Sequence, residues 1–250
     1  MRKPDKPIVC YVTDSRSLTA SAAVDPVEAV LEKIQLAIDA GVHWIQIREK
    51  GLPGRRLLKL TRNAIAAAGD PVHKVPATRT RIFVNDRLDV ALAAGVQALA
   101  TVAGLPAAAG IHLGGDSLPV EQVVRWCRAG NAPPEFQVGL STHSIDQARE
   151  AERAGADYIF FGPVFDTPSK RPFGPPQGLD RLGEICRAIQ VPVIAIGGID
   201  QSNAQLCIRA GASGVAAIRL FQDAANRDEL VQLISTITQG NSAERQGGQR

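Results

Sequence analysis

The sequence predicts a single (β/α)8 barrel, an α/β fold built on parallel strands, and two recurring patterns lead to it. Short apolar segments without polar alternation recur, such as 8–12, 82–84 and 193–196, and these are typical of parallel strands buried on both faces. Helical patterns between the strands end in Ala-Gly pairs, spaced at about twice the roughly 30 residues of one βα unit. The glycines of these pairs are Gly41, Gly95, Gly155 and Gly211. Four double units make the eight of a barrel, although the spacing alone also suits an open, doubly wound sheet.

Length and composition fit one such domain. The chain has 250 residues, close to the roughly 250 of an α/β barrel. Its 45% hydrophobic content excludes disorder over most of the chain, and a net charge of +3 predicts no extended nucleic-acid surface. No run approaches the roughly 20 apolar residues of a membrane helix, and no signal-peptide pattern opens the chain. The four cysteines fall in no metal-binding spacing, which indicates reduced thiols and a cytoplasmic protein.

The expected organisation follows from these limits. We expect the barrel domain to span residues 1–239 and a disordered polar tail to span 240–250. We expect neither nucleic-acid nor membrane partners, and a homo-oligomer is compatible with the sequence. The expected strands cover 8–12, 44–47, 82–84, 111–113, a stretch ending near 141, 158–161, 193–196 and 215–218.

Capping signals support the helices between these strands. Asp25 precedes Pro26, so the sequence places a cap and a proline at the first helical position. Ser144 with Gln147 forms a capping box that opens another helix. Glycine suits the residue after a helix because it enters the left-handed region without a Cβ clash. Extra Ala-, Gly- and Pro-rich sequence at 99–110 separates the helix expected to end before Gly95 from the next strand.

The reactive groups of such a barrel lie at the carboxyl ends of the strands and in the loops that follow. After the second strand, alternation points Gln46, Arg48 and Lys50 into the barrel mouth. Two cations and an amide there predict a pocket for a phosphorylated anion. The alternative is a charged loop in which Arg48 pairs with Glu49.

Carboxylates follow the third and fourth strands. Asp86, next to Asn85, suits Mg²⁺, which prefers one or two carboxylates together with substrate phosphate oxygens. The alternative is that Asp86 caps the helix beginning at Arg87, and the two roles can coexist. Asp116 offers a second metal carboxylate, with a cap for the helix entered at Pro119 as the alternative.

The remaining strand ends predict acid/base and phosphate-binding groups. His143 follows the fifth strand beside Ser141 and could act as acid or base, or as a positioning residue. The loop after the sixth strand carries hydroxyls and a lysine suited to phosphate. Amides at Gly197 and Gly198, with a cation one strand away, predict a second anion site, because phosphate is often bound after strands seven and eight.

The motifs together resemble the thiamine phosphate synthase family, within a wider group that includes the TenI-type thiazole tautomerases. They occur in the family's order as Gln46-Ile-Arg-Glu-Lys50, Asn85-Asp86-Arg87, His112-Leu-Gly-Gly-Asp116, Gly139-Leu-Ser-Thr-His-Ser144, Gly162-Pro-Val-Phe-Asp-Thr-Pro-Ser-Lys170 and Ala195-Ile-Gly-Gly-Ile199. The resemblance implies a barrel that joins 4-amino-5-hydroxymethyl-2-methylpyrimidine diphosphate to a thiazole phosphate carboxylate, releasing diphosphate and CO₂. It also implies Mg²⁺ as cofactor and phosphorylated small molecules as partners.

Residue roles carried over from the resemblance divide into three sets. The catalytic candidates are Arg48, Lys50, Lys170, Ser141 and His143. The substrate-binding candidates are Gln46, Ile47, Arg48, Glu49, Lys50, Asn85, Ser141, Thr167, Pro168, Ser169, Lys170, Gly197, Gly198, Ile218 and Arg219. The metal candidates are Asp86 and Asp116.

Two residues depart from the family pattern. The second metal carboxylate of the family usually stands where this chain has Ser117, so the metal uses either Asp116 after a small backbone shift or Asp86 and phosphate oxygens alone. A serine usually follows the last strand's isoleucine, where this chain has Arg219. A thiazole tautomerase using His143, and a non-catalytic barrel that binds thiamine intermediates, are the alternatives to the synthase.

Overall fold

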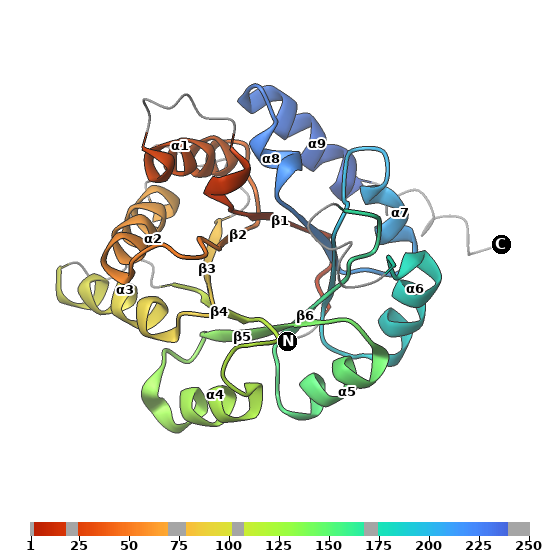
Figure 1. Cartoon of the computed structure of the whole chain (residues 1–250), viewed down its shortest axis with the longest axis horizontal. Helices are drawn as coiled ribbons and strands as arrows, with labels where there is room; N and C mark the ends of the chain where they lie inside the picture. Colours follow the sequence, from red (N-terminus) through yellow and green to blue (C-terminus); the bar gives the residue numbers. More distant parts are fainter. Residues whose placement is uncertain (1–2, 19–24, 70–78, 102–107, 168–174, 240–250) are drawn as a thin grey trace.

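Eight parallel strands pair in chain order and close into a barrel in the computed structural model, viewed down its axis in Figure 1. The structure describes residues 3–18, 25–69, 79–101, 108–167 and 175–239, without the side chains of 96–101. The strands are β1 (Ile8–Val12), β2 (Trp44–Ile47), β3 (Arg81–Asn85), β4 (Gly110–Leu113), β5 (Gln137–Thr142), β6 (Tyr158–Phe161), β7 (Val193–Ile196) and β8 (Gly214–Ala217). β8 pairs back with β1, Gly214 lying opposite Ile8. The predicted (β/α)8 barrel is therefore confirmed, and the open doubly wound sheet is wrong.

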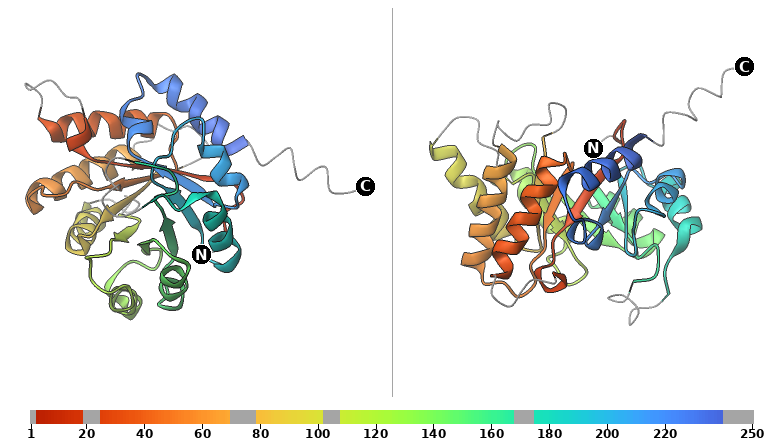
Figure 2. Two further views of the ribbon diagram at one scale, coloured as in Figure 1. Left: turned by 45° about the vertical axis from the view of Figure 1, so that its right-hand side comes forward. Right: turned by 90° about the horizontal axis from the view of Figure 1, so that it is seen from above.

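Helices surround the strands on the outside of the barrel (Figures 1 and 2). They are α1 (Pro26–Asp39), α2 (Gly54–Gly69), α3 (Leu88–Thr101), α4 (Val120–Trp126), α5 (Ile145–Arg153), α6 (Gly178–Ala188), α7 (Ala204–Arg209), α8 (Arg219–Gln222) and α9 (Arg227–Gln239). A 3-10 turn, η1 (Ser15–Ser17), follows β1, and a π-helical segment, η3 (Cys127–Asn131), follows α4. Within the described part of the chain, no helix combines the length and apolar character needed to cross a membrane.

The predicted helix starts are confirmed. The Asp25 carboxylate accepts a hydrogen bond from the Val27 backbone N–H at 3.0 Å, directly before α1. The Ser144 hydroxyl oxygen accepts one from the Gln147 N–H at 3.2 Å, before α5. Each cap satisfies a donor that the first helical turn leaves without a partner.

Three of the four expected helix ends are confirmed, and one is wrong. The chain leaves α1, α5 and α7 through glycines with positive φ, namely Gly41, Gly155 and Gly211. By contrast, α3 continues through Gly95 to Thr101, because a single glycine costs a helix only about 1 kcal/mol. The alanines and leucines around Gly95 favour continuation. The extra sequence at 99–110 therefore begins as helix, and both 102–107 and the predicted tail at 240–250 lie outside the described residues.

The barrel interior is filled by side chains. A buried cluster occupies it, made of Ile8, Cys10, Val12, Trp44, Phe83, Tyr158, Phe160, Ile194 and Ala216. The Trp44 ring centroid lies 4.8 Å from those of both Phe83 and Tyr158. Gly139 makes room for this cluster, because a Cβ there would lie 2.1 Å from the Tyr158 ring. The packed interior leaves the carboxyl ends of the strands as the place where ligands can approach.

Candidate active site

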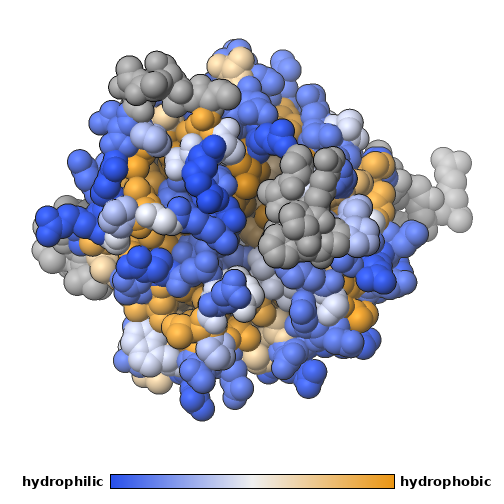
Figure 3. Space-filling view, viewed as in Figure 1, coloured by the Kyte–Doolittle hydropathy of each residue, from blue (hydrophilic) through white to orange (hydrophobic). Residues whose placement is uncertain are grey.

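Polar side chains stand above the aromatic cluster at the carboxyl ends of three strands. Gln46 and Asn85 each follow an interior aromatic residue by two positions, Trp44 in β2 and Phe83 in β3, so both face the barrel interior. Ser141 lies near the end of β5. Figure 3, in the view of Figure 1, shows a recess over the centre of the barrel bordered by hydrophilic residues.

Gln46 carries a buried donor without a protein partner. Its side chain is 2% exposed, and its amide Nε2 has no hydrogen-bond partner among the described residues. A buried donor left unpaired costs about 1–3 kcal/mol. An acceptor atom on a bound ligand would remove this cost, which agrees with the predicted substrate-binding role of Gln46.

Arg48 is held at the mouth by the loop that follows β1. Its guanidinium Nη1 lies 3.4 Å from Asp14 Oδ2, and its backbone N–H donates to Thr13 Oγ1 at 3.0 Å. Arg16 also pairs with Asp14, at 2.9 Å. Burial by itself raises the pKa of Asp14, but the hydrogen bond and charge of Arg16 and the charge of Arg48 bring that pKa below its ordinary value. Asp14 is therefore an ionised counter-ion for two arginines.

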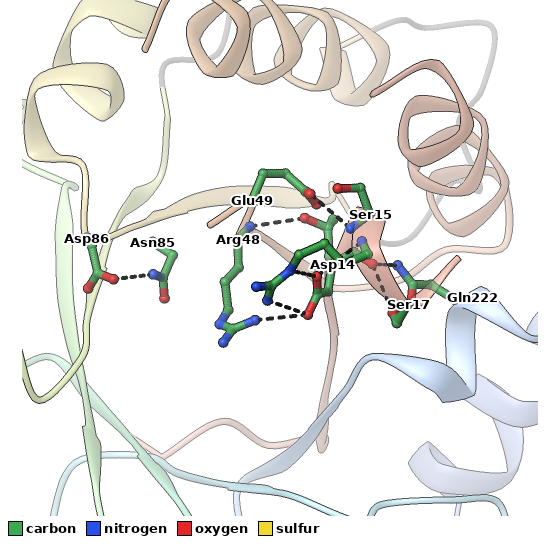
Figure 4. A network of polar contacts seen from close by, with 10 residues as sticks. Asp14, Ser15, Ser17, Arg48, Glu49, Asn85, Asp86 and Gln222 are labelled. Carbon is green, nitrogen blue, oxygen red and sulfur yellow. Dashed lines mark hydrogen bonds and ion pairs between the residues drawn. The ribbon is translucent and has the colours of Figure 1, made fainter. Parts of the chain in front are cut away.

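The alternative pairing of Arg48 with Glu49 is wrong. The Glu49 carboxylate Oε2 instead accepts a hydrogen bond from the Ser15 backbone N–H at 2.9 Å (Figure 4). Ile47 is fully buried in the apolar shell between barrel and helices. These two side chains support the scaffold in this structure, and their predicted contact with substrate stays a prediction. Lys50 is exposed in the turn after β2.

Asp86 occupies an unusual backbone conformation at the end of β3, with φ of 60°. Its carboxylate accepts hydrogen bonds from the Gly114 backbone N–H at 2.9 Å and from the Ser117 hydroxyl. The Asn85 amide donates to it at 2.6 Å. All these bonds come from β3 or from the loop after β4, so the carboxylate is turned towards the mouth, and the alternative role as a cap for α3 is wrong.

Ser117, not Asp116, completes the arrangement around Asp86. Asp116 is exposed, whereas the Ser117 hydroxyl reaches the Asp86 carboxylate. Across the described ranges, no three His, Cys, Asp or Glu side chains gather closely enough to hold a metal by themselves. Of the two metal arrangements expected from the sequence, this geometry favours the one that rests on Asp86 and phosphate oxygens.

Sequence reasoning missed the role of His112, although the residue stands in a quoted motif. His112 lies in β4, fully buried, with its Nε2 2.8 Å from Ser141 Oγ and its Nδ1 3.3 Å from the Tyr158 hydroxyl. Burial lowers the pKa of His112 to about 3, so the ring is neutral. The available signal was strand alternation, which points His112 inward with Gly110.

His143 engages the loop after β6. Its Nδ1 contacts the Gly162 carbonyl oxygen, and its backbone N–H donates to the Gln147 side chain at 2.8 Å. These contacts agree with the positioning role that the sequence left open for His143. An acid/base role stays a prediction.

The loops after β6, β7 and β8 lie close together. Gly197 and Gly198 have φ of 94° and 67°, and a Cβ at Gly198 would lie 2.6 Å from the Asp166 carbonyl oxygen. Ile218 packs against the interior cluster, and Arg219 is exposed at the start of α8. Thr167 is half-buried at the edge of the described loop, while Pro168, Ser169 and Lys170 lie outside the described residues.

Amide donors, cations and a carboxylate at the carboxyl ends of the strands define the class: an enzyme of the (β/α)8 barrel type that binds anionic ligands. Comparison with known proteins gives the family. A family model described as thiamine monophosphate synthase matches residues 11–221. The chain belongs to this family, as the motifs predicted. Membership implies phosphorylated small-molecule substrates and synthesis of thiamine phosphate.

Individual relatives agree with this assignment. The chain is 39% identical over 211 residues to a thiamine-phosphate synthase of Roseiflexus sp. (strain RS-1), covering 84% of this chain and 76% of the relative. It is 32% identical over 237 residues to one from Chlorobium luteolum, covering 95% of each. Among solved structures, a thiamine phosphate pyrophosphorylase from Pyrococcus furiosus superposes with a TM-score of 0.69 at 28% identity, covering 92% of this chain and 96% of that one.

Proposed function

We propose that this chain is a Mg²⁺-dependent transferase that joins 4-amino-5-hydroxymethyl-2-methylpyrimidine diphosphate to a thiazole phosphate carboxylate. The bond between the pyrimidine methylene carbon and the diphosphate breaks, and its electrons leave with the diphosphate. The thiazole nitrogen supplies the electron pair of the new C–N bond. The carboxylate leaves as CO₂, its bonding electrons stay on the ring carbon, and that carbon takes up a proton from water. The observation that carries the proposal is the grouping of Arg48, the unpaired Gln46 amide and Asp86 at one barrel mouth.

Arg48 suits the role of diphosphate ligand because its ion pair with Asp14 is long and Asp14 is shared with a second arginine. The contact with Asp14 is 3.4 Å long, and Asp14 is shared with Arg16 at a shorter distance. Figure 4 shows the Arg48 side chain between Asp14 and the Asn85–Asp86 pair. A guanidinium can form two parallel hydrogen bonds with a phosphate. Since the leaving diphosphate gains negative charge, this contact strengthens towards the transition state.

Donors around Arg48 complete the proposed diphosphate site. The Gln46 amide supplies a neutral donor from β2, and Lys50 supplies a second cation from the turn that follows. Lys170 remains a further proposed ligand of the diphosphate. Ser169, Thr167 and the amides of Gly197 and Gly198 remain our proposed ligands for the second phosphate, that of the thiazole. Arg219 adds a cation next to that site.

A single carboxylate at Asp86 fits magnesium. Mg²⁺ keeps several waters and is usually bound by one or two carboxylates plus substrate phosphate oxygens. When bound, the ion would neutralise charge on the leaving diphosphate. Ser117 and Gly114 orient the Asp86 carboxylate from one side, and Asn85 does so from the other.

The test is formation of thiamine phosphate by purified protein from both substrates, with and without Mg²⁺. We expect metal-dependent product, and loss of product in Asp86→Ala. The matched control is Asp89→Asn, which removes an exposed carboxylate that pairs with Arg87 at the start of α3. A third variant, Asp116→Ala, tests the two-carboxylate arrangement and should stay close to wild type.

Absence of product together with confirmed binding of the thiazole phosphate would overturn the proposal. Isomerisation of the thiazole by the protein, lost in His143→Ala, would then favour the tautomerase. Binding without any turnover would favour the non-catalytic barrel. We also propose a cytoplasmic location, which the four free, buried cysteines support.

A further inference from the structure

We propose that Tyr158 and His112 fix the direction of the Ser141 hydroxyl, so that Ser141 presents its proton to the bound substrate and selects a substrate atom that accepts a hydrogen bond. His112 and Tyr158 are positioning residues in this proposal, since both act through Ser141. The inference rests on the proposed function and deepens it, because the proposed reaction determines which substrate supplies the hydrogen-bond acceptor for Ser141.

The three residues form a continuous chain of contacts from the barrel interior to its mouth. The Tyr158 hydroxyl lies 3.3 Å from His112 Nδ1, and His112 Nε2 lies 2.8 Å from Ser141 Oγ. They come from the neighbouring strands β6, β4 and β5. Tyr158 and His112 are each 1% exposed, whereas Ser141 is half-buried at the mouth. Ser141 is therefore the member of the chain that a ligand can reach.

The His112 ring carries a single N–H, because both of its nitrogens contact hydroxyls and neither contacts a carboxylate, so an imidazolium would be an unpaired buried charge. The ring packs against Phe160, with centroids 4.2 Å apart, and both ring nitrogens are engaged. A neutral imidazole that contacts two hydroxyls donates to one and accepts from the other. Two arrangements are possible. In one, Ser141 donates its proton to His112. In the other, Ser141 accepts a hydrogen bond from His112 and keeps its own proton free for another acceptor.

Tyr158 decides between these arrangements. Burial raises the pKa of Tyr158 well above its ordinary value, so the phenol keeps its proton. Its ring is surrounded by Trp44, Phe83 and Phe160, which offer no oxygen or nitrogen acceptor. Leaving a phenol proton unpaired in such surroundings would be unfavourable, because the hydroxyl would lose its hydrogen bond to water without gaining another.

The other polar groups that interact with Tyr158 do not compete for this proton. The Arg81 guanidinium, which lies over the Phe83 ring, brings only donors, and the Cys10 sulfur is a weak acceptor. The Asp157 carboxylate interacts with Tyr158 only through its charge, since its oxygens accept hydrogen bonds from other donors. Among the described residues, His112 Nδ1 is the acceptor within hydrogen-bond distance of the phenol. Tyr158 therefore donates to Nδ1, and the His112 proton resides on Nε2.

The direction of the hydrogen bond between His112 and Ser141 follows from this position of the His112 proton. Nε2–H donates to Ser141 Oγ and occupies a lone pair of that oxygen. The Ser141 proton is then not used by His112 and is available to a ligand at the mouth. A ring nitrogen or a phosphate oxygen of the substrate would satisfy it, whereas an amino group in that place would leave it unpaired. By orienting Ser141, His112 and Tyr158 thus favour a substrate that places a hydrogen-bond acceptor next to the Ser141 hydroxyl.

The first test measures the proton directly. In protein labelled with ¹⁵N at histidine, the nitrogen shifts and the couplings to ring protons distinguish the two neutral tautomers. Loss of signals in His112→Gln assigns the residue. We expect the Nε2–H form in wild type and a mixture of both forms in Tyr158→Phe. The Nδ1–H form in wild type would overturn the proposal.

The second test uses a double-mutant cycle on the KM for the pyrimidine diphosphate. We expect Ser141→Ala and Tyr158→Phe each to raise KM about tenfold, and the double variant to be no worse than Ser141→Ala alone. An undiminished effect of Tyr158→Phe in the Ser141→Ala background would show that Tyr158 acts through packing. The matched control is Tyr11→Phe, another fully buried tyrosine, which lies in the outer apolar shell and should change neither KM nor the tautomer.

The two tests separate this inference from the proposed function. The tautomer is measured without turnover. If no thiamine phosphate forms while His112 carries its proton on Nε2, the proposed function fails and the direction of the Ser141 hydroxyl stands.

Discussion

Acid should destabilise this protein through His112. The residue is fully buried, and burial lowers its pKa from 6.5 to about 3 in the folded chain. Between these two values the unfolded chain binds the proton and the folded chain does not, so stability falls as the pH drops below 6.5. The loss grows by about 1.4 kcal/mol per pH unit, and from pH 7 to pH 4.5 it reaches about 2–3 kcal/mol.

The perturbation that isolates this contribution is His112→Gln, which removes the titrating group and keeps an amide donor. Urea unfolding of both proteins at pH 7 and pH 4.5 gives four free energies, and all other titrating groups, including His43, cancel in the double difference. EDTA is included so that no metal neutralises Asp86, whose charge favours protonation of His112. We expect wild type to lose about 2–3 kcal/mol more than the variant over this range. Equal losses would refute a neutral, buried His112.

Two further predictions concern stability at neutral pH. Ser144→Ala should cost about 1 kcal/mol in urea unfolding, because it removes the acceptor for the Gln147 N–H at the start of α5, and an unchanged midpoint would contradict this role. Gly139→Ala should cost about 3 kcal/mol or more, since the new Cβ would lie 2.1 Å from the Tyr158 ring. Gly115→Ala, where nothing lies within 4 Å, is its control, and similar thermal midpoints for the two variants would contradict the packing argument.

The strands were predictable because their signal is local. Buried parallel strands are short apolar runs, and the expected segments 8–12, 44–47, 158–161 and 193–196 match β1, β2, β6 and β7 residue for residue. The end of α3 was not predictable in this way, because a lone glycine is a weak signal against strong helix formers on both sides.

The residue types of the site were predictable, but their partners were not. Alternation placed Gln46 and Arg48 at the mouth, yet the counter-ion of Arg48 is Asp14, 34 residues away in sequence. Ser117 meets Asp86 across 31 residues. Such pairs depend on the register between strands and on loop conformation, which one sequence does not reveal. The same holds for His112, whose importance comes from contacts with two other strands.

The position of the long α3 has a consequence for how the family's sequences can vary. Because α3 ends at Thr101 and β4 begins at Gly110, these two residues lie on the side of the barrel where the strands begin, opposite the mouth that holds Arg48 and Asp86. The connection between them therefore starts and ends remote from the chemistry, so added length there gives no reason to expect lost catalysis. The same two anchor points mark a practical place for engineering, where an epitope or fluorescent reporter can be introduced.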